Sequence, residues 1–123
     1  MNNEQKTQSI SEFYPNGTLK NKYNKIGDLL NGECTSYYTN GNLRFRSFYG
    51  NGVQNGISEI WYENNQKQSE EHYLNGKLIG IGKEWYENGV LKSTTTYDND
   101  GNEASHEDFY ETGVLHFDRR SVS

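Results

Sequence analysis

A 24-residue repeat constrains the fold of this chain more than any other feature of its sequence. A tyrosine recurs every 24 residues, at Tyr14, Tyr38, Tyr62, Tyr86 and Tyr110. An aromatic residue precedes it each time, at Phe13, Tyr37, Trp61, Trp85 and Phe109. A glycine and a leucine follow in four of the five copies, at Gly17/Leu19, Gly41/Leu43, Gly89/Leu91 and Gly113/Leu115, while the third copy has Asn65 and Lys67. Five copies in phase indicate a repeat protein.

Each copy has the composition of a β-hairpin. An Asn-Gly pair is the strongest short-range hairpin signal, because both residues of a type I′ turn need positive φ. A second, looser series lies between the copies, with tyrosines at Tyr23, Tyr49, Tyr73 and Tyr97 and glycines at Gly32, Gly56 and Gly80. No apolar pattern with the 3.6-residue period of a helix extends over the length of a helix, because a glycine interrupts each candidate. The sequence therefore predicts an all-β fold, an elongated antiparallel meander of about five 24-residue β-hairpin repeats with about ten strands.

The repeats set the expected domain boundaries. We expect a disordered or frayed lead over residues 1–11, a repeat domain over residues 12–117, and a C-terminal tail over residues 118–123. The chain is poor in apolar residues apart from its aromatic ones, so we expect a thin core. Ten tyrosines and two tryptophans supply the missing apolar area.

Charge and composition exclude several classes of function. A net charge of −5 argues against nucleic acid, which needs a basic patch. No apolar run is long enough for a transmembrane segment, and residues 1–11 contain no signal-peptide core. We expect a cytoplasmic protein, with a removed signal or lipoprotein segment as the alternative. Cys34 stands alone, which rules out an internal disulfide and predicts a small, buried or half-buried side chain.

A two-residue turn at each Asn-Gly pair would place the motif residues on two faces of the sheet. Tyr86 would lie opposite Leu91 on a structural face, and Trp85 opposite Lys92 on the other. A one-residue bulge would break these pairs. The second face would align an aromatic with a cationic or polar residue in each repeat. The candidate partner-binding residues on this face are Tyr37, Arg44, Trp61, Gln68, Trp85, Lys92, Phe109 and His116. The alternative is that these pairs only stabilise the sheet.

The aromatic-Tyr-x-Asn-Gly-x-Leu motif, with the following Tyr and Gly series, resembles the variant MORN repeat. That variant occurs in bacterial proteins labelled as YwqK-family antitoxins. The resemblance covers residues 13–117, and the third copy departs from it at Asn65 and Lys67. It implies a meander of hairpins, a non-enzymatic role, and a protein partner such as a toxin.

No catalytic or metal-binding motif is recognisable, so we expect neither an enzyme nor a cofactor. His72, His106 and His116 lack the spacing of a zinc site. The segment 98–102 resembles a calcium loop only faintly and is expected to be a turn. The predicted function is a protein-binding repeat module, and its leading specific form is an antitoxin or immunity-type protein. A structural or membrane-surface scaffold and a glycan-binding module are the alternatives, and open edge strands would allow self-association.

Overall fold

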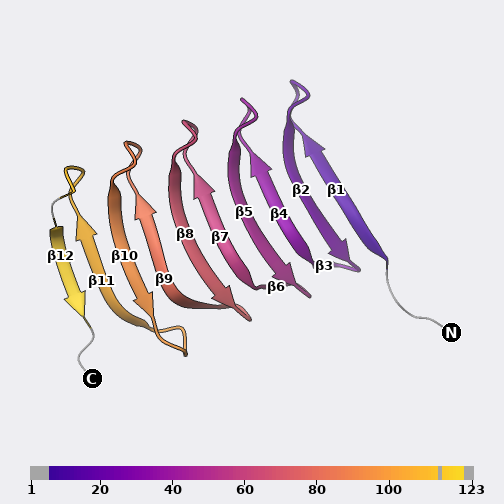
Figure 1. Ribbon diagram of the computed structural model, residues 1–123. Coiled ribbons are helices and arrows are strands. Elements are labelled where there is room, and N and C mark those ends of the chain that lie inside the picture. Colours follow the sequence, from indigo (N-terminus) through magenta and orange to yellow (C-terminus); the bar gives the residue numbers. More distant parts are fainter. Residues whose placement is uncertain (1–5, 114, 121–123) are drawn as a thin grey trace.

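One antiparallel sheet makes up the described part of the chain. The computed structural model describes residues 6–113 and 115–120 (Figure 1). Its strands are β1 (Thr7–Phe13), β2 (Leu19–Ile26), β3 (Leu29–Leu30), β4 (Gly32–Tyr37), β5 (Leu43–Gly50), β6 (Val53–Gln54), β7 (Gly56–Trp61), β8 (Lys67–Leu74), β9 (Lys77–Trp85), β10 (Leu91–Tyr97), β11 (Glu103–Phe109) and β12 (Leu115–Arg120).

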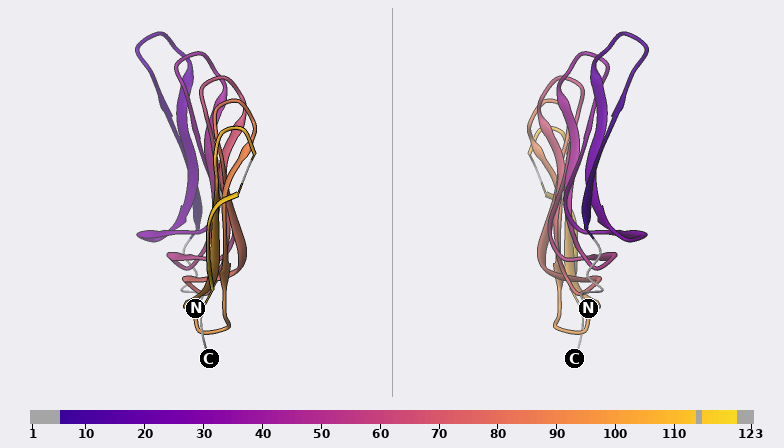
Figure 2. Two further views of the ribbon diagram at one scale, coloured as in Figure 1. Left: turned by 90° about the vertical axis from the view of Figure 1, so that its left-hand side faces the viewer. Right: turned by 90° about the vertical axis from the view of Figure 1, so that its right-hand side faces the viewer.

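The strands follow one another in the sheet in chain order, which confirms the predicted meander of hairpins. Ten strands form the path β1-β2-β4-β5-β7-β8-β9-β10-β11-β12, and the two-residue strands β3 and β6 pair beside it. Seen along its edge, the sheet is one curved, twisted layer, with no second layer over either face in the described residues (Figure 2). Both faces are therefore open to solvent.

The sheet reaches beyond the expected repeat domain at both ends. β1 begins at Thr7, inside the predicted lead. It pairs with β2 residue by residue, and Thr7 opposite Ile26 is the first pair. β12 continues to Arg120, inside the predicted tail. Backbone hydrogen bonds between paired strands hold these two segments in the sheet, although their polar sequences offer little apolar area.

The motif turns differ from the two-residue turns that the Asn-Gly pairs predict. The Gly89 amide donates to the Tyr86 carbonyl at 2.9 Å, and the Tyr86 amide donates to the Val90 carbonyl at 2.8 Å. Gly89 has φ +88°, while Asn88 does not have positive φ. This is a type I turn followed by a glycine bulge. Asn65, at φ +74°, takes the glycine position in the third copy.

The glycine bulge shifts the pairs next to the turn by one residue, so the predicted facing pairs of the motif are wrong. Trp85 lies opposite Leu91 rather than Lys92. Lys92 is the extra residue of a second bulge, and from the next pair, Glu84 with Ser93, the register is again that of a two-residue turn. The same shift gives the pairs Phe13–Leu19, Tyr37–Leu43, Trp61–Lys67 and Phe109–Leu115.

The type I′ prediction is right at the opposite edge of the sheet. Asn51 and Gly52 have φ of +49° and +81°, and Asn75 and Gly76 have +48° and +84°. Gly50 pairs with Val53 and Leu74 with Lys77 across these two-residue turns. The same dipeptide thus forms two turn types, one at each edge.

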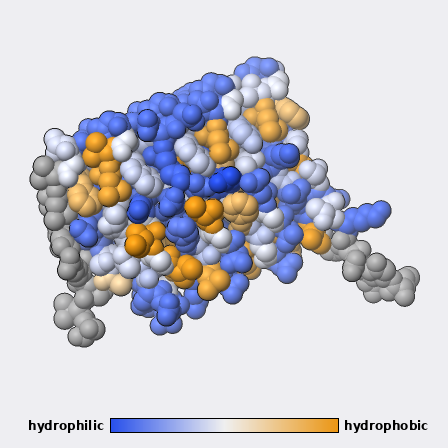
Figure 3. Space-filling model, viewed as in Figure 1, coloured by the Kyte–Doolittle hydropathy of each residue, from blue (hydrophilic) through white to orange (hydrophobic). Residues whose placement is uncertain are grey.

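The core is thin, as predicted. Cys34, 6% exposed, is the one hydrophobic residue classed as buried among the described residues, and its buried neighbours are small or polar. Burial, with the nearby Glu33 carboxylate, raises the pKa of the Cys34 thiol. The face shown in Figure 3 is mostly hydrophilic, with hydrophobic residues in separate patches.

Candidate functional site

The predicted aromatic strip lies on one face, which we call the network face because Arg46, Glu59 and Glu70 share it. These three residues are direct partners across β5, β7 and β8. Strand alternation places Trp61 on the face of Glu59. By the same register, Tyr37, Trp85 and Phe109 also lie on this face. Successive aromatics are two strands apart, about 9.5 Å. The rings therefore form a strip without stacking on one another.

The polar members of the predicted site occupy the bulges. Arg44, Gln68 and Lys92 are each skipped by the strand pairing, and Arg44 and Lys92 are exposed. The Lys92 ammonium lies 5.7 Å from the Tyr86 ring, and Lys20 lies 5.5 Å from Tyr14. Lys92 therefore lies over a turn tyrosine and not over Trp85, its predicted partner. The side chain of His116 lies outside the described residues.

The turn tyrosines tie each repeat to the next. The Tyr62 hydroxyl donates to the Trp85 carbonyl oxygen at 2.7 Å. The same bond joins Tyr14 to Tyr37, Tyr38 to Trp61, and Tyr86 to Phe109, at 2.6–2.7 Å. Burial, with Glu87 and Glu84 nearby, raises the pKa of the Tyr62 phenol. The motif tyrosine therefore recurs every 24 residues for a structural reason.

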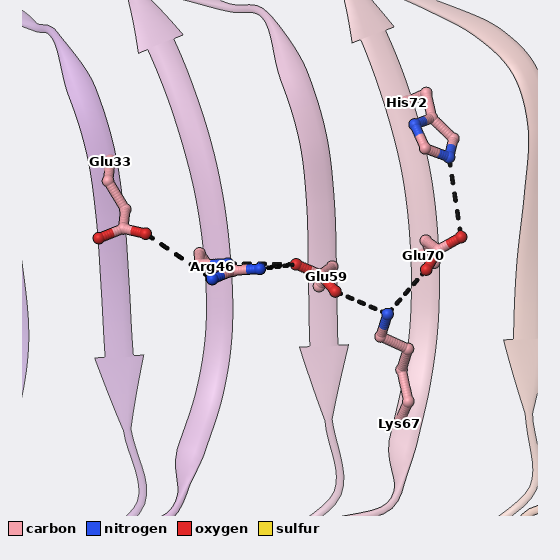
Figure 4. A network of polar contacts seen from close by, with 6 residues as sticks. All are labelled: Glu33, Arg46, Glu59, Lys67, Glu70 and His72. Atoms are coloured by element: carbon pink, nitrogen blue, oxygen red, sulfur yellow. Dashed lines mark hydrogen bonds and ion pairs between the residues drawn. The ribbon is translucent and has the colours of Figure 1, made fainter.

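A network of charged residues crosses the middle of the sheet (Figure 4). The buried Glu59 carboxylate accepts from Arg46 Nη2 at 2.8 Å and lies 2.6 Å from Lys67 Nζ. Lys67 also bonds Glu70 at 2.7 Å, while Glu33 is 3.9 Å from Arg46. Burial raises the pKa of Glu59, but hydrogen bonds from Lys67 and Arg46 outweigh it and the net pKa is lowered.

This network explains the irregular third copy of the motif. Lys67 stands where other copies have leucine, and it lies opposite Trp61 with its ammonium 5.7 Å from the indole ring. Burial lowers the pKa of Lys67, but the hydrogen bonds that its ammonium donates to Glu59 and Glu70 make the net shift upward. The lysine is therefore held as a cation between two carboxylates, a role that leucine could not fill.

The opposite side, which we call the tyrosine face, carries Tyr23, Tyr49, Tyr73 and Tyr97. Three of these tyrosines lie directly opposite a glycine, in the pairs Gly32–Tyr49, Gly56–Tyr73 and Gly80–Tyr97. A glycine leaves room beside an aromatic ring. Sequence reasoning missed this face, although the regular glycines at 32, 56 and 80 signalled it.

Hollows run along the tyrosine face. One of about 450 Å³ is bordered by Tyr23, Leu30, Cys34, Phe45 and Tyr49, together with polar residues. A second hollow of about 260 Å³ adjoins it and shares Phe45, Ser47 and Tyr49. A smaller one of about 40 Å³ lies further along, beside Glu71, Gly82 and Tyr97.

In the described residues, no group of three or more His, Cys, Asp and Glu residues could hold a metal ion. The segment 98–102 is a turn, in which the Asp98 carboxylate accepts from the amides of Asp100 and Asn102, both at 2.9 Å. His106 bonds Thr95 and Asp108, each at 2.7 Å, on the open tyrosine face.

The comparisons with known proteins agree with this periodic hairpin structure. The family model described as MORN repeat variant matches residues 30–52, 54–75 and 78–99. These segments begin 24 residues apart and cover more than half of the chain. The chain belongs to the MORN repeat variant family.

The structure extends the repeat beyond the matched MORN segments. Tyr14 donates to the Tyr37 carbonyl and Tyr86 to the Phe109 carbonyl, so the first and fifth hairpins join the same ladder. No curated protein and no solved structure matches the chain. No helix in the described residues is long and apolar enough to cross a membrane.

Proposed function

We propose that this MORN repeat protein is a non-enzymatic binding module that attaches to a protein partner through its open sheet. The observation that carries this proposal is the single layer: in the described residues neither face is covered, and both display aromatic side chains. Repeat sheets of this kind offer large surfaces that grow with the number of repeats. Interfaces are enriched in tryptophan, tyrosine and arginine, which this sheet exposes in part.

The specific form we propose is an antitoxin or immunity-type protein that blocks a toxin by covering it. The strip of Tyr37, Trp61, Trp85 and Phe109 would supply the contacts on the network face. A rigid sheet needs little ordering on binding, which favours affinity. The exposed acidic residues Glu63, Glu87 and Glu111 at the turns would favour a basic partner.

Capture from native lysate tests the proposal, with immobilised wild-type protein beside the Trp61→Ala/Trp85→Ala variant. We expect one identified protein to bind the wild type in a fixed ratio, and the complex to re-form from purified components. Loss of capture by the folded variant would place the contact on the strip. Capture that survives in the variant would keep the binding function and make the strip structural. Absence of any protein that re-forms a complex would contradict the function itself.

A further inference from the structure

The tyrosine face has the shape and charge of a second binding surface. Its two adjoining hollows lie over β2, β4, β5 and β7, and aromatic walls from Tyr23, Phe45 and Tyr49 line the larger one. A volume of about 450 Å³ is within the range of ligand-binding clefts. Lys25 and Asp28 also border it, and their opposite charges cancel, while Arg44 borders the second hollow. This end of the face therefore suits a large apolar side chain.

The other end of the tyrosine face is acidic. Glu71 and Glu84 lie on this face beside the small hollow, with Gly82 and Tyr97 between them. Gly82 leaves this space, because a Cβ there would come within 3.5 Å of both Glu71 and Tyr97. Lys83 also borders the hollow, but its register places it on the network face, opposite Glu70.

No ion pair of Glu71 or Glu84 is seen in the part of the chain that the structure describes. Where strands β7 to β11 pair in register, their positions on the tyrosine face hold neither lysine nor arginine, and Lys92, the bulge residue of β10, contacts the Tyr86 ring at 5.7 Å. Asp108 adds a third acidic group there, although His106 contacts it at 2.7 Å. Burial, with the neighbouring Glu84, raises the pKa of Glu71. A bound cation would relieve the unfavourable burial of this charge.

We propose that the tyrosine face binds an extended protein segment that carries a large apolar residue and a basic residue. This inference rests on the proposed protein-binding function and names the chemistry of the partner. The apolar side chain enters the hollow between Tyr23 and Tyr49, and the lysine or arginine meets Glu71 and Glu84. The segment runs across the strands. It therefore contacts the side chains of the sheet and does not pair with an edge strand.

The strand spacing fixes the separation of the two anchors. The centre of the larger hollow lies near β4, and the acidic hollow lies near β9, four strands away along the sheet. Four spacings of about 4.8 Å give about 19 Å, the length of about six extended residues. The apolar and the basic residue should therefore be about six positions apart.

Selection from a library of random 12-residue peptides tests this inference on the full chain. We expect enriched peptides to carry Phe, Trp or Leu about six positions from Lys or Arg. Synthetic copies of these peptides should bind Glu71→Gln/Glu84→Gln at least fivefold more weakly than wild type. The matched control Glu33→Gln/Glu107→Gln removes the same charge from the network face and should change binding less than twofold. Glutamine has the shape of glutamate without its charge, so we expect both variants to fold, which circular dichroism checks.

Three outcomes would overturn the inference: no enrichment, enriched peptides without basic residues, or equal weakening in the two variants. Peptides whose binding is lost only in Trp61→Ala/Trp85→Ala would also overturn it. That last outcome would leave protein binding in place on the network face. Failure of the lysate experiment is a separate result, so the two proposals can fail independently.

Discussion

At the residue scale, the turn tyrosines stabilise the contact between repeats through a hydroxyl that reaches the next hairpin. Tyr62→Phe removes the bond to the Trp85 carbonyl and keeps the ring, so we expect a loss of about 1 kcal/mol in the free energy of unfolding. Urea denaturation measures it. Tyr73→Phe is the matched control, because no hydrogen bond of the Tyr73 hydroxyl is seen in the described structure. Equal losses in the two variants would contradict the ladder.

The glycine of the motif turn is required by its backbone conformation. Gly89 has φ +88°, and a Cβ there would lie 3.3 Å from the Gln66 side chain. We expect Gly89→Ala to lower the free energy of unfolding by about 1–2 kcal/mol. Gly50→Ala should be nearly neutral, since Gly50 has no positive φ and a Cβ there meets open space. A thermal melt of each variant measures the difference, and similar losses would count against the bulged turn.

At the scale of the elements, the charged network joins β5, β7 and β8. Glu59→Gln leaves Arg46 and Lys67 without their shared carboxylate, so we expect a loss of about 2 kcal/mol at neutral pH. Glu33→Gln is the control, because Glu33 is half exposed and 3.9 Å from Arg46, and it should cost under about 0.5 kcal/mol.

The stabilisation by Glu59 depends on pH in a defined direction. Its pKa is lower in the folded state than in the unfolded state. The stabilisation is therefore complete above the unfolded pKa of about 4.3 and is lost as the pH falls through the lower, folded value. Urea denaturation across this range should show wild type and Glu59→Gln converging in acid. A constant difference at all pH values would contradict the role of the carboxylate.

The sequence predicted the hairpins and their order but not the register of the pairs next to each motif turn. The Asn-Gly pair fits a type I′ turn and a bulged type I turn alike, and the choice moves the pairs nearest the turn by one residue, until the second bulge restores the register. Thr112 before Gly113 was a sequence feature that favoured the bulged turn, since a β-branched residue disfavours positive φ and therefore the type I′ turn. The contact of Tyr62 with Trp85 and the charged network could not be predicted, because they depend on how neighbouring hairpins are aligned with one another, which the motif turns do not determine.

At the scale of the whole molecule, each strand contacts its sequence neighbours, so stability should depend on which repeat is lost. Deletion of residues 7–30 removes one terminal hairpin and one interface between hairpins. Deletion of the 24 residues 56–79 keeps the repeat phase but removes Glu59 and Lys67 and joins strands that were never partners. We expect the second deletion to unfold at lower urea concentration than the first. The reverse order would contradict a one-dimensional arrangement of repeats.

The most direct test of this account is the radius of gyration of the protein in solution, measured by small-angle X-ray scattering. Both proposed binding surfaces require a single-layer sheet with two open faces. Ten strands at about 4.8 Å spacing predict a plate about 48 Å long and a radius of gyration of about 17 Å. Forward scattering should match the 14.2 kDa of one chain. A value near 14 Å, as for a compact globule of this length, would contradict the open sheet and the binding surfaces inferred from it.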